Sequence, residues 1–107
     1  MKAIKMVILI LLLIPTVSFA GEIYGTITYD NGQPFAKQKV KITTPDNQVI
    51  ESATDDNGYF TITIPSTGKC TLETGGCSTD VYSNDGPNGY TLSIVNANTT
   101  ECQLKKQ

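Results

Sequence analysis

Three cysteines are the residues of this chain with the clearest chemical potential, because histidine and arginine are both absent. Without histidine the chain lacks the commonest general base and the usual activator of a nucleophile. Without arginine it lacks the side chain that binds a carboxylate or a phosphate through two parallel hydrogen bonds. We therefore predict no catalytic residues and no cofactor, and we expect a protein that is not an enzyme.

The cysteines are Cys70, Cys77 and Cys102, and an odd number favours one disulfide and one free thiol. Cys70 shares its parity with Leu72 in an alternating segment, so it should point into the core as a small apolar side chain. Cys77 follows the turn Gly75-Gly76, and a crosslink to Cys102 would hold the C-terminal tail in place. We predict a Cys77–Cys102 disulfide, with the two pairings that involve Cys70 as alternatives. A zinc site would need a fourth ligand and Cys-x-x-Cys spacing, so no metal site is predicted.

The first twenty residues have the pattern of an export signal. Two lysines precede an apolar run from Met6 to Pro15, and Ser18-Phe19-Ala20 fits the small-x-small site of a signal peptidase. The alternative, a membrane-spanning helix, needs about 18 or more apolar residues in a row. We predict that residues 1–20 are a cleaved signal peptide and that residues 21–107 form one domain. The mature protein should be secreted or periplasmic, where disulfides persist, and not inserted in a membrane.

The charge balance excludes one class of partner. Removing the signal takes away two of eight lysines and none of ten acidic residues, so the mature charge is 6 − 10 = −4. Neutralising the phosphates of a nucleic acid requires a basic face. We therefore predict no nucleic-acid partner.

Apolar and polar residues alternate along the mature chain with a period of two, as in strands that bury one side. The clearest example is Tyr59–Ile64, in which Phe60, Ile62 and Ile64 share one side. Further strands are expected over 22–29, 39–43, 48–54, 70–74, 77–83, 90–94 and 101–104, with a loop over 84–89. Because turn residues separate these segments at near-regular spacing, the fold class should be an all-β, antiparallel Greek-key β-sandwich of about seven strands.

Polar residues on two of these strands mark a candidate ligand face. Tyrosine rings combine an apolar surface with a polar tip, which suits the surfaces of proteins and sugars. Ordinary strand composition would also explain these residues, and whether they are neighbours depends on the strand order. The predicted face comprises Tyr24, Thr26, Thr28, Tyr59, Thr61 and Thr63.

Two acidic turns contain oxygen atoms of the kind that bind calcium. They are Asp55-Asp56-Asn57-Gly58 and the segment from Asp80 to Gly86. Neither has the spacing of an EF-hand with its terminal bidentate Glu. Asp, Asn and Gly are also the ordinary residues of tight turns, and we favour that interpretation.

Several of these motifs together resemble the carboxypeptidase regulatory-like domain, a family with the transthyretin-like, or prealbumin-like, β-sandwich fold. The resemblance covers about Gly21 to Glu73 and, more loosely, Pro87 to Leu92. Cys70 stands where the family usually has an aromatic residue. The matching motifs are Ile23-x-Gly25-x-Ile27, Asp30-x-Gly32-x-Pro34, Val40-x-Ile42, Thr54-Asp55-x-x-Gly58-x-Phe60-x-Ile62-x-Ile64-Pro65 and Gly68-x-Cys70-x-Leu72.

The resemblance implies a non-catalytic accessory module. Hydroxyisourate hydrolases share the fold but use His and Arg, which this chain lacks. Collagen-adhesin B-type domains are similar around Glu73, and some form a Lys–Asn isopeptide bond, but the first strand here has no Lys. We expect an interaction or assembly component of the cell envelope or secretome with a protein partner, and a carbohydrate-binding module as the alternative. An enzyme of another type is the third class.

Overall fold

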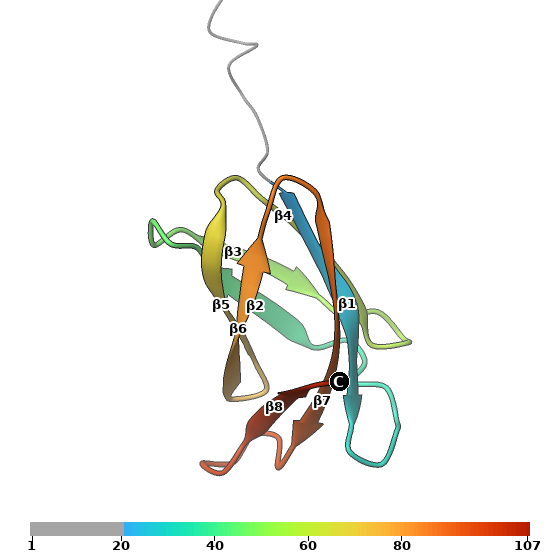
Figure 1. Ribbon diagram of the computed structural model, residues 1–107. Helices are drawn as coiled ribbons and strands as arrows, with labels where there is room; N and C mark the ends of the chain where they lie inside the picture. The colour runs from blue at the N-terminus through green and yellow to red at the C-terminus, as the bar shows by residue number, and fades with distance from the viewer. Residues whose placement is uncertain (1–20) are drawn as a thin grey trace, which may run out of the picture.

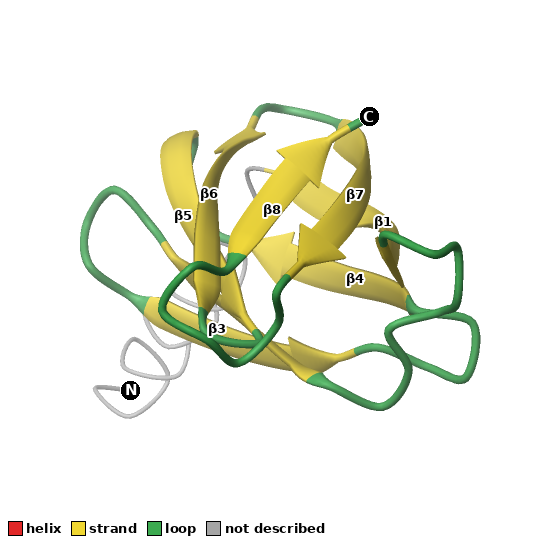
Figure 2. Ribbon diagram, turned by 90° about the horizontal axis from the view of Figure 1, so that it is seen from below, coloured by secondary structure: helices red, strands yellow, loops and turns green. Residues whose placement is uncertain are grey.

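A computed structural model describes residues 21–107, and every regular element in this range is a strand. The predicted signal peptide, residues 1–20, lies outside the described residues. No helix in the described range is long and apolar enough to cross a membrane. Figure 2 shows the strands and the loops that join them.

Eight strands, one more than the predicted seven or so, form two sheets of four (Figure 1). The sheet we call sheet A has the order β4-β1-β7-β8, and sheet B has the order β3-β2-β5-β6. The bounds are β1 Gly21–Tyr29, β2 Lys39–Thr43, β3 Val49–Ala53, β4 Tyr59–Ile64, β5 Gly68–Thr74, β6 Cys77–Ser83, β7 Pro87–Val95 and β8 Gln103–Lys106.

The core lies between the two sheets and is built by the alternation seen in the sequence. In β4 the side chains of Phe60, Ile62 and Ile64 are buried, and the three between them are exposed. Inward residues of seven strands join one buried apolar cluster, and Phe35 adds to it from the loop after β1. The eighth strand, β3, contributes partly buried Ile50, which packs against the cluster. This arrangement confirms the all-β sandwich.

The direction of one strand pair differs from the prediction. β1 and β7 run parallel, and Figure 1 shows them side by side, so sheet A is mixed rather than antiparallel. Residues 30–86 connect these two strands, and a long connection permits a parallel pair where a tight hairpin does not. The Greek-key connectivity stays a prediction.

The predicted loop over 84–89 is wrong in its second half. β7 begins at Pro87, because Pro87, Asn88 and Gly89 pair with the first residues of β1. The last strand also begins later than predicted, at Gln103, and pairs with the end of β7.

The disulfide between Cys77 and Cys102 is confirmed, with the two Cα atoms 5.3 Å apart. Cys77 begins β6 in sheet B, and Cys102 directly precedes β8 in sheet A. The bond therefore joins the two sheets along one side of the sandwich. Cys70 is free and buried, as its parity predicted.

Candidate functional site

Sheet A brings the two strands of the predicted ligand face together. β1 and β4 are hydrogen-bonded neighbours, with Tyr24 paired to Thr61 and Thr26 paired to Tyr59. The outward side chains of both strands therefore form one continuous surface. That this surface binds a ligand stays a prediction, but its residues are neighbours, which the sequence left open.

The ring of Tyr24 extends from β1 over β7. A Cβ atom placed on Gly89 would lie 2.7 Å from both Cζ and Oη of Tyr24, so the missing side chain of Gly89 makes room for the ring. The Tyr24 side of this contact faces solvent, and the residue is 37% exposed. Tyr59, diagonally across on β4, is 43% exposed. Two tyrosines thus stand at the surface of one sheet.

The surface continues across β7 to β8. Thr91 pairs with Thr26, and Ser93 lies between Thr28 on one side and Lys105 on the other. We call this surface the tyrosine–threonine face. Its members are Tyr24, Thr26, Thr28, Tyr59, Thr61, Thr63, Gly89, Thr91 and Ser93.

Charged groups lie only at the margins of this face. Among the outward residues of the sheet A strands, the charged ones are Glu22, near the start of β1, and Lys105 on β8. The hydroxyl of Thr61 donates to Glu22 Oε2 at 3.2 Å, which holds the carboxylate over the rim. The centre of the face offers hydroxyl groups and aromatic rings without a formal charge.

The outer face of sheet B has a different composition. Lys39 forms an ion pair with Glu51 at 3.8 Å, and Lys69 forms one with Asp80 at 3.5 Å. Its charged outward residues are Lys39, Lys41, Glu51, Lys69, Glu73 and Asp80.

Glu73 and a shallow depression also belong to this outer face. Glu73 is exposed on β5 opposite Lys41, whereas an isopeptide bond needs a buried acid. An open depression of about 300 Å³ lies beside these residues. Its lining residues are Lys39, Lys41, Glu73, Thr74, Gly75, Gly76 and Cys77. The only cysteine in that lining is in the disulfide, so no free thiol is offered there.

The free thiol of Cys70 is not arranged for catalysis. Its side chain is buried, 1% exposed, among the apolar residues of the core. Burial raises the pKa of this thiol, and the negative charge of Asp46 raises it further. Because the thiolate is the nucleophilic form, the raised pKa makes Cys70 a poor nucleophile.

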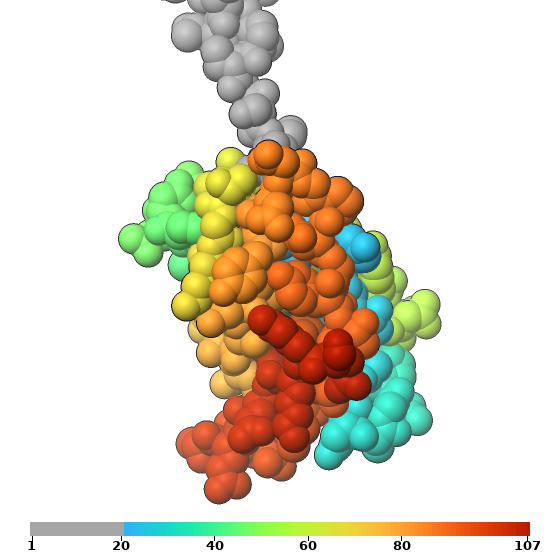
Figure 3. Space-filling view, viewed as in Figure 1, coloured from blue at the N-terminus to red at the C-terminus, as the bar shows by residue number. Residues whose placement is uncertain are grey.

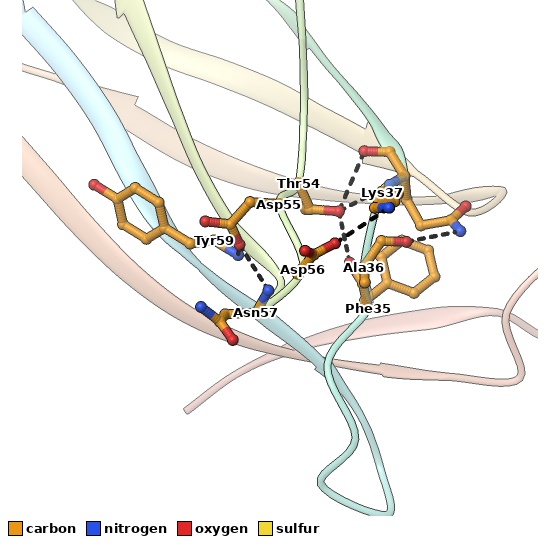
Figure 4. A network of polar contacts seen from close by, with 9 residues as sticks. Phe35, Ala36, Lys37, Thr54, Asp55, Asp56, Asn57 and Tyr59 are labelled. Carbon is orange, nitrogen blue, oxygen red and sulfur yellow. Dashed lines mark hydrogen bonds and ion pairs between the residues drawn. The ribbon is translucent and has the colours of Figure 1, made fainter.

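The acidic turn before β4 uses its oxygen atoms within the fold (Figure 4). Asp55 Oδ1 accepts hydrogen bonds from the backbone N–H groups of Asn57 and Tyr59, at 2.8 and 3.0 Å. Asp56 forms an ion pair with Lys37 at 3.4 Å. In the range that the structure describes, no three His, Cys, Asp or Glu side chains are placed to hold a metal ion. These contacts support the interpretation of the segment as a turn.

Buried Thr54 ties this turn to the loop before β2, a role that the sequence analysis missed. Its hydroxyl donates to the carbonyl of Phe35 at 2.6 Å and accepts from the N–H of Gln38 at 2.8 Å. The sequence feature that indicates this role is the position of Thr54 beside Asp55 at the end of a predicted strand, where a Thr hydroxyl commonly forms hydrogen bonds with the backbone. Thr54 is structural, since its polar atoms are satisfied inside the fold.

The backbone edges of the sandwich are partly covered. Ser52 Oγ donates to the carbonyl of Thr61 at 3.2 Å, which links β3 to β4. On the other side the N–H of Tyr82 donates to Tyr90 Oη at 2.7 Å. Lys106 Nζ lies 5.9 Å from the ring centroid of Tyr82 and 5.7 Å from that of Tyr90. Figure 3 shows the C-terminal residues, in dark red, against the orange segments of this side.

The chain matches no protein-family model, and a comparison with curated proteins finds no significant relative.

Proposed function

We propose that residues 21–107 form an exported, non-catalytic module that binds a protein partner, as an interaction or assembly component of the cell envelope or secretome. The observation that carries the proposal is the tyrosine–threonine face. Centres of protein interfaces are depleted in charged residues and enriched in tyrosine, and tyrosines frequently dominate the binding energy. Exposed Tyr24 and Tyr59 are therefore the proposed anchors.

The covered edges favour binding through this face. A partner that adds a strand to a sheet needs free backbone N–H and C=O groups along an edge. Here Ser52 bonds the β4 edge, Tyr90 bonds the β6 edge, and β8 is short and carries two lysines, which discourage strand addition. The outer face of sheet A has no such protection.

The export part of the proposal is supported by the signal-like sequence pattern of residues 1–20. The disulfide is compatible with an extracellular location, because such bonds persist in oxidising compartments. A sandwich of two sheets is also the fold that the resemblance to the carboxypeptidase regulatory-like domain implies, and we propose membership of that family.

One observation favours carbohydrate as a second candidate ligand. The ring of Tyr24 lies across Gly89 among threonine hydroxyls, and no charged group stands at the centre of the face. An aromatic surface with neighbouring hydroxyls can pack on an uncharged sugar ring and bond its hydroxyls. The same two tyrosines would then serve a polysaccharide.

The test is capture of partners from the native envelope by the mature, oxidised protein. The chain with Tyr24→Ser and Tyr59→Ser should lose its partner. The control is Tyr82→Ser, which removes a tyrosine of similar exposure, 46%, from sheet B and should retain the partner. A glycan array with the same three proteins separates the two ligand classes. Capture and glycan binding by the double variant that both match those of the wild-type protein would contradict a role for this face.

A further inference from the structure

We propose that the tyrosine–threonine face binds a second copy of this chain, with Glu22 of each copy opposite Lys105 of the other. The inference rests on the proposed function, since it names the partner of the same face. It uses one feature of that face, the two opposite charges at its margins.

Glu22 and Lys105 lie at opposite corners of the face. Glu22 is on β1, and Lys105 is on β8, two strands away, in the row that contains Ser93 and Thr28. With about 4.8 Å between strands and about 3.3 Å per residue, they are about 10 Å apart across the sheet and about 20 Å apart along it. No ion pair within 4 Å engages either group among residues 21–107. One copy cannot pair these two charges with each other.

A two-fold axis would pair both at once. In a symmetric dimer the same patch of both copies forms the interface. If Glu22 of one copy contacts Lys105 of the other, then Lys105 of the first copy also contacts Glu22 of the second. The midpoint between Glu22 and Lys105 lies among the paired residues Tyr24, Gly89, Thr26 and Thr91. A two-fold axis that lies in the plane of the interface, passes through this point and runs perpendicular to the line from Glu22 to Lys105 brings each Glu22 to the other copy's Lys105. It also places the uncharged centre of the face, with Tyr24, at the middle of the contact.

Sheet B does not offer the same complementarity. Four of its six outward charges are already paired within the chain, as Lys39–Glu51 and Lys69–Asp80. Docking two copies of this face would bury both ion pairs, and removing paired charges from water is costly. The charge pattern therefore favours sheet A as the self-docking surface.

The area of the face limits the expected affinity of the dimer. Four strands about 4.8 Å apart and about 20–25 Å long give a face of about 400–500 Å². Stable complexes bury about 800 Å² of each partner. We therefore expect a weak, concentration-dependent dimer.

The experiment is sedimentation velocity of the mature, oxidised chain over a wide range of concentrations. The wild-type protein should dimerise. Glu22→Lys alone and Lys105→Glu alone should each raise the dimer dissociation constant at least about tenfold, because symmetry repeats the like-charge contact twice. The double charge reversal, with both substitutions in one chain, should restore dimerisation to within about threefold of wild type.

Glu73→Lys is the matched control, because it reverses an exposed carboxylate on the outer face of sheet B and should leave the dimer intact. Thermal unfolding of each variant shows whether it is folded. A wild-type protein that stays monomeric up to about 1 mM would overturn the inference. A double variant as weak as the single ones would also overturn it. If the monomer still captures a different protein through Tyr24 and Tyr59, the proposed function survives without self-association.

Discussion

The outer face of sheet B carries six charged residues, whereas that of sheet A has charges only at Glu22 and Lys105. Both faces belong to four-stranded sheets whose inner sides pack on the same core. The fold therefore does not require the two outer faces to differ in their number of charged residues. Charged residues on an exposed sheet keep it soluble and discourage association, and sheet A omits them over most of its surface. This contrast in charge fits the proposal that the outer face of sheet A contacts a partner, whereas that of sheet B stays in water.

The largest expected effect comes from breaking the bond that joins the two sheets. Cys77→Ser should lower the free energy of unfolding by about 2–4 kcal/mol, because the disulfide restricts the unfolded chain. Urea unfolding with and without a reductant measures this, and peptide mapping of the unreduced protein should recover the Cys77–Cys102 link. If reduction leaves the unfolding midpoint unchanged, the bond does not stabilise the sandwich as described.

A somewhat smaller loss is expected at the turn that joins the two sheets before β4. Gly58 has a φ of +79°, and a Cβ there would lie 2.3 Å from the carbonyl oxygen of Ile27. Gly58→Ala should therefore lower the free energy of unfolding by about 2–3 kcal/mol, because the new Cβ strains the backbone and collides with the Ile27 carbonyl. Gly32 also has a positive φ, +90°, but nothing lies within 4 Å of its Cβ position.

Gly32→Ala is therefore the control. It should lower the free energy of unfolding by only about 1 kcal/mol, which is the part due to the positive φ alone. Thermal or urea unfolding of the two variants gives the comparison. Equal losses would mean that the contact with Ile27 is not a constraint.

The third effect depends on pH and concerns the core that both faces share. The folded state raises the pKa of Cys70 above its ordinary value of 9.0. Well below pH 9.0 the thiol is protonated in both the folded and the unfolded state, so it does not make stability depend on pH there. As the pH rises further, the unfolded state ionises first, and the free energy of unfolding should fall. Urea titrations of wild type and Cys70→Ala from pH 7 to 10.5 measure this.

Lysines and tyrosines contribute equally to the pH dependence of both proteins. The decrease in the free energy of unfolding that wild type shows and Cys70→Ala does not is therefore due to the thiol. Alkylation of Cys70 should also be slower in the folded protein than in urea, because burial suppresses the thiolate. Parallel pH profiles for the two proteins would show that the thiol ionises equally in the folded and unfolded states.

Much of the fold was predictable because local alternation decides which side of a strand is buried. Tyr59–Ile64 shows this most clearly, since three apolar residues on one side are enough to orient β4. The parity of Cys70 likewise predicted its burial and left Cys77 and Cys102 for the disulfide. The burial of these side chains depends mainly on neighbours in the sequence, whereas the disulfide also needs the two sheets to bring Cys77 and Cys102 together.

The rest of the candidate site was not predictable in this way. Pro87 and Gly89 are unfavourable in strands, so their segment was expected to be a loop. Pairing with β1 overrides that tendency, and this pairing joins residues more than 60 positions apart. The contact between Tyr24 and Gly89, and the extension of the face to Thr91 and Lys105, follow from that long-range pairing.

The smallest expected change in stability comes from two lysine substitutions that show directly whether the outer face of sheet A, and not that of sheet B, binds a partner. Thr26 and Thr43 are both half-buried strand residues, one on each outer face. Lysine at either position should alter the free energy of unfolding by no more than about 0.5 kcal/mol. The measurement is the amount of protein captured from the native envelope by Thr26→Lys and Thr43→Lys side by side. We expect Thr26→Lys to reduce capture at least about tenfold and Thr43→Lys to leave it unchanged. Equal capture by both variants, or loss only with Thr43→Lys, would contradict binding through the outer face of sheet A.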